Sequence, residues 1–227
     1  FMNPELYTGN DGTHAITGVG FQPDLVWIKP RNYADHHRLV DSVRGLYQIY
    51  SNRDVAQDAT GSNFASFDSD GFTLGGSDGG WNSSSYNYES WNWKAGTAVS
   101  GATTGAGTPK TYTGSVNTTS GFSIIKYVGN GTAGHTIPHR LGVVPKMIIV
   151  KSLGSVQDWQ VYTSTLGATK YMVLNTTTDL NDLDTVWNDT EPTSSVFTLG
   201  TLNKVNNDDS SFIAYCFADV AGYSKFS

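Results

Sequence analysis

Five aromatic residues crowd into the thirteen positions from 81 to 93 and are the first candidates for binding chemistry: Trp81, Tyr86, Tyr88, Trp91 and Trp93. Sugar sites in proteins stack a flat ring on the apolar face of the sugar, with a few polar groups placed around it. Side chains of those polar types lie in the same stretch: Asp78, Asn82, Asn87 and Glu89. The stretch therefore predicts a saccharide site built from Trp81, Tyr86 and these four polar residues.

A core role is the alternative for each aromatic residue. Strand alternation places Trp91 and Trp93 on one face, and residues aligned with them in the second half of the chain are Tyr215 and Phe217. That shared aromatic character favours core packing for both tryptophans. Trp81 and Tyr86 align with Val205 and Ser210, so a shared fold does not require an aromatic ring at either position. Ligand contact and core packing both stay open for them.

Paired carboxylates are the next candidates, because Ca²⁺ takes six to eight oxygen ligands. Asp68 and Asp70 are weak candidates for a metal, and similar acidic groups occur in the second half at Asp182, Asp184, Asp189, Asp208 and Asp209. No EF-hand spacing is present. Asp and Gly residues also suit hairpin turns, and we favour that role for 68–71.

Histidines and catalytic groups give weaker signals. His36 and His37 are adjacent, so a strand would point them to opposite faces, which is unfavourable for chelation. His135 and His139 are a second conceivable pair of metal ligands. His14 and His135 occur at matching places in the two halves, so we favour a structural role in which they hold a turn by hydrogen bonding. Catalytic motifs are absent, and no pair of carboxylates stands out for glycoside cleavage. We predict no catalytic residue, cofactor or metal.

One motif organises the chain, because it occurs twice. Gly20–Lys29 and Gly142–Lys151 each contain a proline turn, four apolar residues and a final lysine, and Pro23 and Pro145 are 122 residues apart. Such an apolar run predicts a strand that is covered on both faces. Other matches follow the same offset: Tyr7–Asn10 with Tyr127–Asn130, Asn52 with Asn175, and Phe72–Gly75 with Phe197–Gly200. We interpret the chain as a duplicated domain.

Short strands with turn residues between them fill each half, which favours an all-β fold of two tandem β-sandwiches of jelly-roll or lectin-like type. The first sandwich is predicted at 1–96 and the second at 120–227. Residues 97–119 are rich in Gly, Thr, Ala and Ser and are interpreted as a linker.

Composition excludes several functions. The 227 residues include 25 Gly, 12 Tyr and 10 Phe with a net charge of −6, so no basic stripe exists for nucleic acid or for a membrane surface. Cys216 is the only cysteine and is predicted to be a buried apolar residue. No apolar run is long enough to span a bilayer. We interpret the two ends, Phe1–Asn3 and Tyr223–Ser227, as cuts within a longer protein.

Several long motifs resemble a repeat domain of marine bacteriophages, which occurs, often in tandem, in tail-fibre and other virion structural proteins. They are Gly20–Lys29, Asp41–Gly45, Ser66–Gly75, Trp91–Gly96 and, in the second half, Gly131–His139. The first copy departs from that family in its last strand, where Glu89 and Asn92 replace apolar residues. The resemblance implies a location on a virion, outside the cell, and host-surface glycans or receptors and other virion proteins as partners.

These observations predict a non-catalytic tail-fibre module that recognises its host by carbohydrate binding and can form a homo-oligomer. Two alternatives stay open. One is a purely architectural virion or decoration protein without a ligand. The other is a tail-associated glycan depolymerase.

Overall fold

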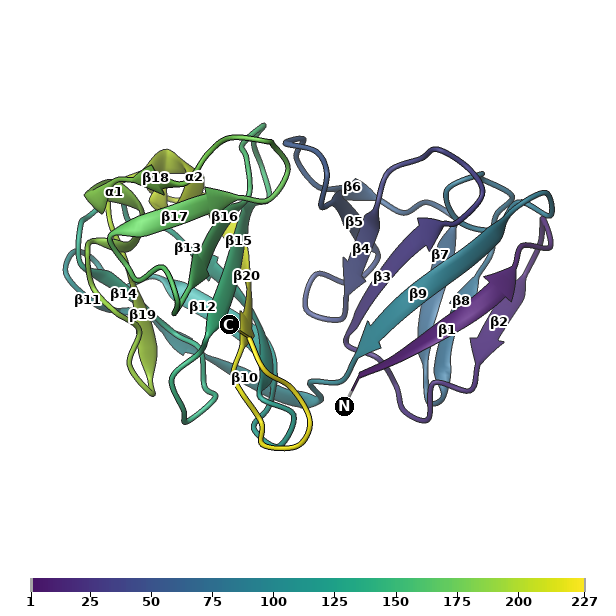
Figure 1. Cartoon of the computed structure of the whole chain (residues 1–227), viewed down its shortest axis with the longest axis horizontal. Helices are drawn as coiled ribbons and strands as arrows, with labels where there is room; N and C mark the ends of the chain where they lie inside the picture. Colours follow the sequence, from purple (N-terminus) through teal and green to yellow (C-terminus); the bar gives the residue numbers. More distant parts are fainter. Residues whose placement is uncertain (1, 227) are drawn as a thin grey trace. The chain divides into compact units, whose positions relative to one another are not determined.

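The structure, a computed structural model, describes residues 2–226, and their regular secondary structure is almost wholly antiparallel strand, which confirms the all-β prediction. The chain forms two compact units (Figure 1). The first ends at Gly96, where the sequence placed the boundary, and the second begins at Thr97 and also takes in Asp54–Ala56. No helix among residues 2–226 has the length and hydrophobicity that spanning a membrane would require.

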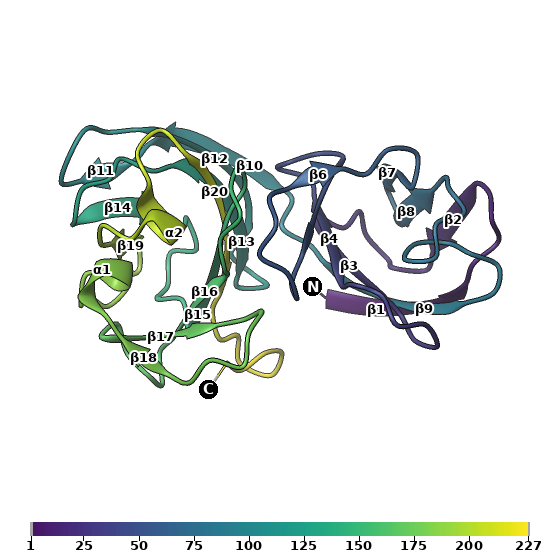
Figure 2. The ribbon, with the colours of Figure 1, turned by 90° about the horizontal axis from the view of Figure 1, so that it is seen from above.

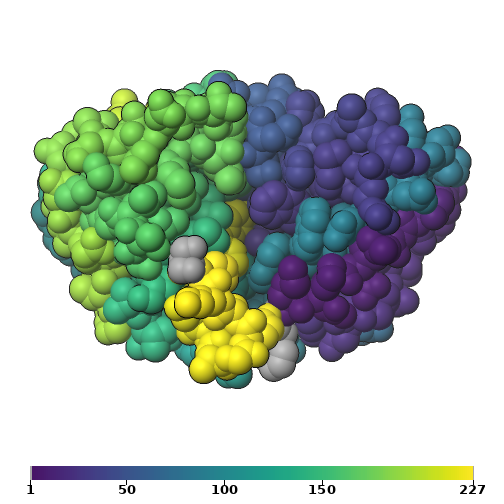
Figure 3. Space-filling model, in the orientation of Figure 1, coloured from purple at the N-terminus to yellow at the C-terminus, as the bar shows by residue number. Residues whose placement is uncertain are grey.

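The first unit is a sandwich of a six-stranded and a three-stranded sheet. The large sheet has the order β1 (Met2–Thr8), β9 (Asn87–Trp93), β3 (Leu25–Pro30), β4 (Arg38–Asp41), β5 (Tyr47–Tyr50) and β6 (Asp58–Ala59). The small sheet has the order β2 (His14–Thr17), β8 (Gly71–Leu74) and β7 (Phe64–Asp68). Val26 and Ile28 of β3 point into the core between the sheets, which also contains Phe64, Phe72 and Leu74. The edge strand β1 lies at the surface (dark purple in Figure 3).

The second unit has an eight-stranded and a three-stranded sheet, and in each unit the two sheets face each other as layers (Figure 2). Its large sheet has the order β10 (Thr97–Ala102), β12 (Thr111–Asn117), β13 (Phe122–Val128), β20 (Ser211–Phe217), β15 (Met147–Ser152), β16 (Gln160–Thr163), β17 (Lys170–Val173) and β18 (Asn181–Asp182). The small sheet has the order β11 (Thr104–Gly105), β14 (His135–Pro138) and β19 (Val196–Leu199). Two single-turn helices complete it: α1 (Asp184–Trp187) and α2 (Asn203–Asn206).

The two units share a strand order. The series β1-β9-β3-β4-β5-β6 of the first unit corresponds to β13-β20-β15-β16-β17-β18 of the second, and the pair β2-β8 corresponds to β14-β19. The repeated apolar runs become β3 and β15, each paired with the last strand of its unit. This common order is what a duplication predicts, and the duplication itself stays an interpretation.

The predicted linker at 97–119 is wrong, because this segment forms β10 and β12 at one edge of the large sheet. Tyr112 and Val116 of β12 are buried in the second core, where the Gly-, Ser- and Thr-rich composition hid their inward alternation. Gly114 is needed for the close pairing, since a Cβ there would lie 2.4 Å from the carbonyl oxygen of Ile124. Small residues here therefore allow tight strand packing rather than flexibility.

Cys216 is fully buried on β20, as predicted. Burial raises the pKa of its thiol to about 12, so the thiolate needed for redox or nucleophilic chemistry does not form near neutral pH.

Two buried histidines of the second unit, His135 and His139, are hydrogen-bonded through both ring nitrogens. His135 Nδ1 donates to Asn206 Oδ1 at 2.8 Å, so the neutral ring accepts from Thr103 Oγ1 through Nε2. His139 accepts from the Leu141 amide through Nδ1 and donates to the Thr193 carbonyl oxygen. Burial lowers the pKa of both imidazoles. Folding therefore favours the uncharged rings.

We expect the free energy of unfolding of the second unit to fall as the pH is lowered from about 7.5 to about 5, because the unfolded chain takes up protons on these histidines near pH 6.5 and the folded unit does not. Above about pH 6.5 the two neutral histidines contribute fully to the free energy of unfolding. This contribution is lost as the pH falls through their lowered pKa values in the folded unit. Urea unfolding at a series of pH values measures the effect. A free energy that stays constant across this range would contradict it.

Candidate functional site

One end of the first sandwich carries two stacked tyrosines, of which Tyr33 is exposed and Tyr86 is half-buried against the core. Tyr33, in the loop 31–37 between β3 and β4, stacks on Tyr86, in the loop that leads to β9, with ring centroids 4.3 Å apart and planes at 9°. Tyr33 keeps 43% of its surface exposed. Gly79 lies against both rings, since a Cβ there would be 3.3 Å from each. We call Tyr33 and Tyr86 the tyrosine platform.

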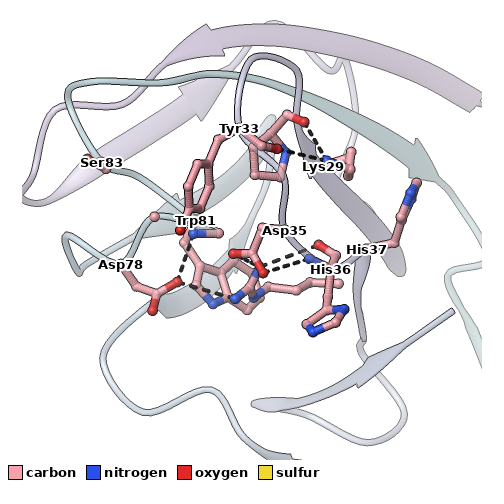
Figure 4. Close-up of polar contacts among 12 residues, drawn as sticks. Lys29, Tyr33, Asp35, His36, His37, Asp78, Trp81 and Ser83 are labelled. Carbon is pink, nitrogen blue, oxygen red and sulfur yellow. Dashed lines mark hydrogen bonds and ion pairs between the residues drawn. The ribbon is translucent and has the colours of Figure 1, made fainter. Parts of the chain in front are cut away.

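Hydrogen bonds from both side chains and backbone fix the loop that carries Tyr33. The Asn87 amide donates to Asn32 Oδ1 at 2.8 Å, and the Arg31 amide donates to the Asn87 carbonyl oxygen at 2.7 Å. Lys29 Nζ donates to the carbonyl oxygens of Pro30 and Tyr33 (Figure 4). The loop is thus tied to the start of β9, and the platform has a defined position.

The Arg38 guanidinium binds two carboxylates from the segments that form the platform: Asp35, in the loop of Tyr33, and Asp78, next to Gly79. Nη1 lies 2.9 Å from Asp35 Oδ2, and Nη2 lies 3.4 Å from Asp78 Oδ1. Burial opposes ionisation of Asp35, but hydrogen bonds from the His36 amide and from Arg38 outweigh it and lower the pKa of that carboxyl. The side chain of Asp78 remains 48% exposed, so part of this carboxylate stays open to solvent.

The structure brings some of the predicted saccharide residues together and separates others. Tyr86, Asp78 and the exposed Asn87 lie at this end of the unit. Glu89, half-buried, is two residues further along β9. Sequence reasoning missed Tyr33, whose only signal was an aromatic residue in a polar loop.

Trp81 is a core residue, which contradicts its predicted ligand role. It is 1% exposed and packs beside Phe64, with ring centroids 6.1 Å apart. Its carbonyl oxygen accepts from Tyr7 Oη at 2.8 Å. The aligned residue Val205 is also fully buried and accepts from Tyr127 Oη in the same way, so the position is an inward one in both units.

Asn82 is likewise structural and not a ligand residue. Fully buried, it accepts from the Asn10 amide and His14 Nδ1 through Oδ1 and donates to the carbonyl oxygens of Gly12 and Gly76. Asn206 makes the equivalent set with the Asn130 amide, His135 Nδ1 and the carbonyl oxygens of Thr132 and Gly200. We call each arrangement an asparagine clip. The two clips confirm that His14 and His135 hold a turn by hydrogen bonding.

The weak metal candidates have protein partners. Asp68 accepts from the hydroxyls of Ser66 and Thr73, and Asp70 accepts from the amides of Gly18 and Gly20. The hairpin between β7 and β8 turns at 68–71, as predicted. Within residues 2–226, no three His, Cys, Asp or Glu side chains are grouped closely enough to hold a metal ion.

A second feature lies on the outer face of the large sheet, where Trp27, His37, Trp91 and Trp93 line an open pocket of about 270 Å³. The predicted core role of Trp91 and Trp93 is wrong, because Tyr88, Ser90 and Asn92 point inward and both tryptophans are half-buried on the outside. The prediction that β3 is covered on both faces is also wrong, because Trp27 lies on the outer face and is only half-buried. Trp27 lies directly opposite Trp91 in the strand register.

Comparison with known proteins gives one match. A family model with the description "Domain of unknown function (DUF7483)" matches residues 1–227 and so covers both units. Neither the curated proteins nor the solved structures contain a match to this chain.

Proposed function

We propose that the chain, which belongs to the DUF7483 family, is a non-catalytic module that binds a saccharide at the tyrosine platform. The observation that carries this proposal is the exposed Tyr33 ring, held in place by Tyr86 and by the tied loop 31–37. A rigid aromatic ring can stack on the apolar face of a sugar at little cost in conformational entropy. Asp78 and Asn87 would accept and donate hydrogen bonds to sugar hydroxyls at its rim.

Carboxylate chemistry at this end supports binding over hydrolysis. A glycosidase requires one protonated carboxylic acid and a second carboxylate on the other side of the bond. Asp35 and Asp78 instead share the Arg38 guanidinium, and the lowered pKa of Asp35 keeps that carboxyl ionised at neutral pH. These two groups suit an acceptor surface for hydroxyls.

The setting we propose is a phage virion, on a tail fibre or a similar appendage that meets a host-surface glycan. The motifs that resemble marine phage virion proteins support this setting. One exposed ring, that of Tyr33, predicts weak affinity per site, and many copies on one particle would raise the overall affinity through multivalency.

Replacement of Tyr33 by Ala tests the proposal. We expect the intact chain, displayed in multivalent form on a glycan array, to bind a defined set of glycans, and Tyr33→Ala to weaken that binding about tenfold through loss of the stacking surface. Tyr47→Ala is the matched control, because Tyr47 is 45% exposed and lies at the opposite end of the β4–β5 hairpin. Array binding that is equal for Tyr33→Ala and the unaltered chain would remove the platform as the site. An unaltered chain that binds no glycan would refute the function.

An architectural role is the second candidate, and the edge strand β1 favours it. Leu6 is 62% exposed and Met2 is 37% exposed, and both lie on the outer face of a strand whose other edge is unpaired within its sheet. Exposed apolar side chains on an edge strand favour pairing with another chain. Light scattering of Leu6→Lys against the unaltered chain distinguishes this role, since only an assembly through β1 would dissociate.

A further inference from the structure

The outer-face pocket has walls that stand at angles to one another instead of forming a flat platform. The ring of Trp27 makes an angle of 73° with that of Trp91, 38° with that of Trp93 and 75° with that of His37. The three ring centroids lie 5.9–6.5 Å from the Trp27 centroid. The rings contact one another at these angles and together form the walls of an open recess. We call these four residues the aromatic cage.

The cage offers its occupant few hydrogen bonds. Its lining among the described residues is three tryptophans and one histidine, without a carboxylate, amide or hydroxyl. Trp27 Nε1 donates to His37 Nδ1 at 3.1 Å, so that indole N–H and that ring nitrogen already satisfy each other. A sugar ring placed inside would leave hydroxyls unpaired, which costs free energy. A group that needs no hydrogen bond therefore fits better.

The volume of the pocket further limits which class of ligand fits. About 270 Å³ is just below the range of roughly 300–1,000 Å³ for ligand pockets, so the cage suits one compact group. Tryptophan faces attract cations more strongly than other aromatic rings do, and cages of such rings recognise quaternary ammonium groups. We propose that the aromatic cage of Trp27, His37, Trp91 and Trp93 binds a methylated ammonium group, of the kind that choline carries.

Charges around the cage are compatible with a cation. His37 is neutral when Nδ1 accepts from the indole, and burial, aided by the nearby charges of Lys29 and His36, lowers the pKa of this imidazole. The Lys29 ammonium is held by the carbonyl oxygens of Pro30 and Tyr33 at the loop end (Figure 4). Glu89 lies opposite Lys29 in the strand register and on the same face as Trp91, so its carboxylate offsets that positive charge.

Choline chloride is the probe, titrated into the full chain while tryptophan fluorescence and the heat of binding are followed. The neutral isostere 3,3-dimethylbutanol is the control ligand, because it has the same shape without the charge. We expect saturable choline binding at millimolar concentration, with the isostere at least tenfold weaker. Equal affinity for the two ligands, or no choline binding, would overturn the proposal.

Substitutions of Trp91 test whether choline binds at the aromatic cage. Trp91→Ala should weaken choline binding about tenfold or more, and Trp91→Phe should weaken it several-fold while it keeps a ring in the wall. Leu6→Ala is the matched control, because Leu6 is an exposed apolar residue on the same sheet face and does not line the cage. Thermal unfolding of each variant verifies that it is folded. Choline affinity that is the same in folded Trp91→Ala and Leu6→Ala would exclude the cage. This test does not depend on the glycan array, so either proposal can fail alone.

Discussion

Trp81→Ala should lower the free energy of unfolding of the first unit by about 3–5 kcal/mol, the usual range for removal of a large buried aromatic side chain. The ring is 1% exposed and belongs to the core that contains Phe64 and Tyr88. The Arg38 guanidinium carbon lies 5.5 Å from the Trp81 ring centroid, so the substitution also removes a cation–π partner from a nearly buried charge. Both losses act in the same direction.

Urea unfolding of Trp81→Ala measures this loss, with Tyr33→Ala as the control. Tyr33 is exposed and its removal deletes the stacking contact with Tyr86, so it should lower the free energy of unfolding by only about 1 kcal/mol. The two variants also separate stability from binding, since Tyr33→Ala should bind saccharide about tenfold more weakly while it remains stable. If Trp81→Ala kept the stability of the unaltered chain and lost only the glycan, Trp81 would be a ligand residue after all.

Strands were predictable where alternation and apolar runs are local signals. The run Leu25–Ile28 became β3, and the hairpin turn at 68–71 lies where Asp and Gly tolerate the required backbone. The second unit shows the same agreement at Met147–Val150 in β15. A residue pattern that repeats within one strand or one turn carries enough information to place that element.

The site was less predictable, because tertiary contacts decide it. Trp81 sits in a polar loop, and nothing in its neighbours shows that the loop turns its ring between the two sheets. The useful signal was the alignment of Trp81-Asn82 with Val205-Asn206, in which a valine indicates an inward position. Tyr33 and Tyr86 are 53 residues apart, so no local pattern predicts that they stack.

The core prediction for Trp91 and Trp93, which lie on the outer face of the large sheet, was wrong for a different reason. Tyr215 and Phe217, the counterparts of Trp91 and Trp93, are buried, but neither belongs to the core cluster of the second unit. Aligned aromatic residues therefore indicated that these positions share one face of the strand. They did not indicate whether that face packs between the two sheets or lies on the outside. In β9 the inward face carries Tyr88, Ser90 and Asn92, a more polar set than a core strand usually has.

Asn206→Ala should destabilise the second unit by about 3 kcal/mol or more, because it leaves several buried polar groups without partners at once. The substitution removes the acceptor for His135 Nδ1 and the Asn130 amide, and the donor to the carbonyl oxygens of Thr132 and Gly200. Asn206 is 0% exposed, so bulk water does not replace these bonds directly. The clip therefore contributes far more than one average hydrogen bond.

Two further substitutions make the Asn206 test specific. Asn206→Asp keeps the shape of the side chain but places a carboxylate oxygen against the carbonyl oxygens of Thr132 and Gly200, so we expect a loss at least as large as for Ala. Asn207→Ala removes an adjacent exposed amide that bonds only to the Ser210 hydroxyl among the contacts described, and should cost less than about 1 kcal/mol. Denaturant unfolding of the three variants gives the comparison. Equal stability of the Asn206 and Asn207 variants would show that the clip is dispensable and that the turn it joins is held by its backbone alone.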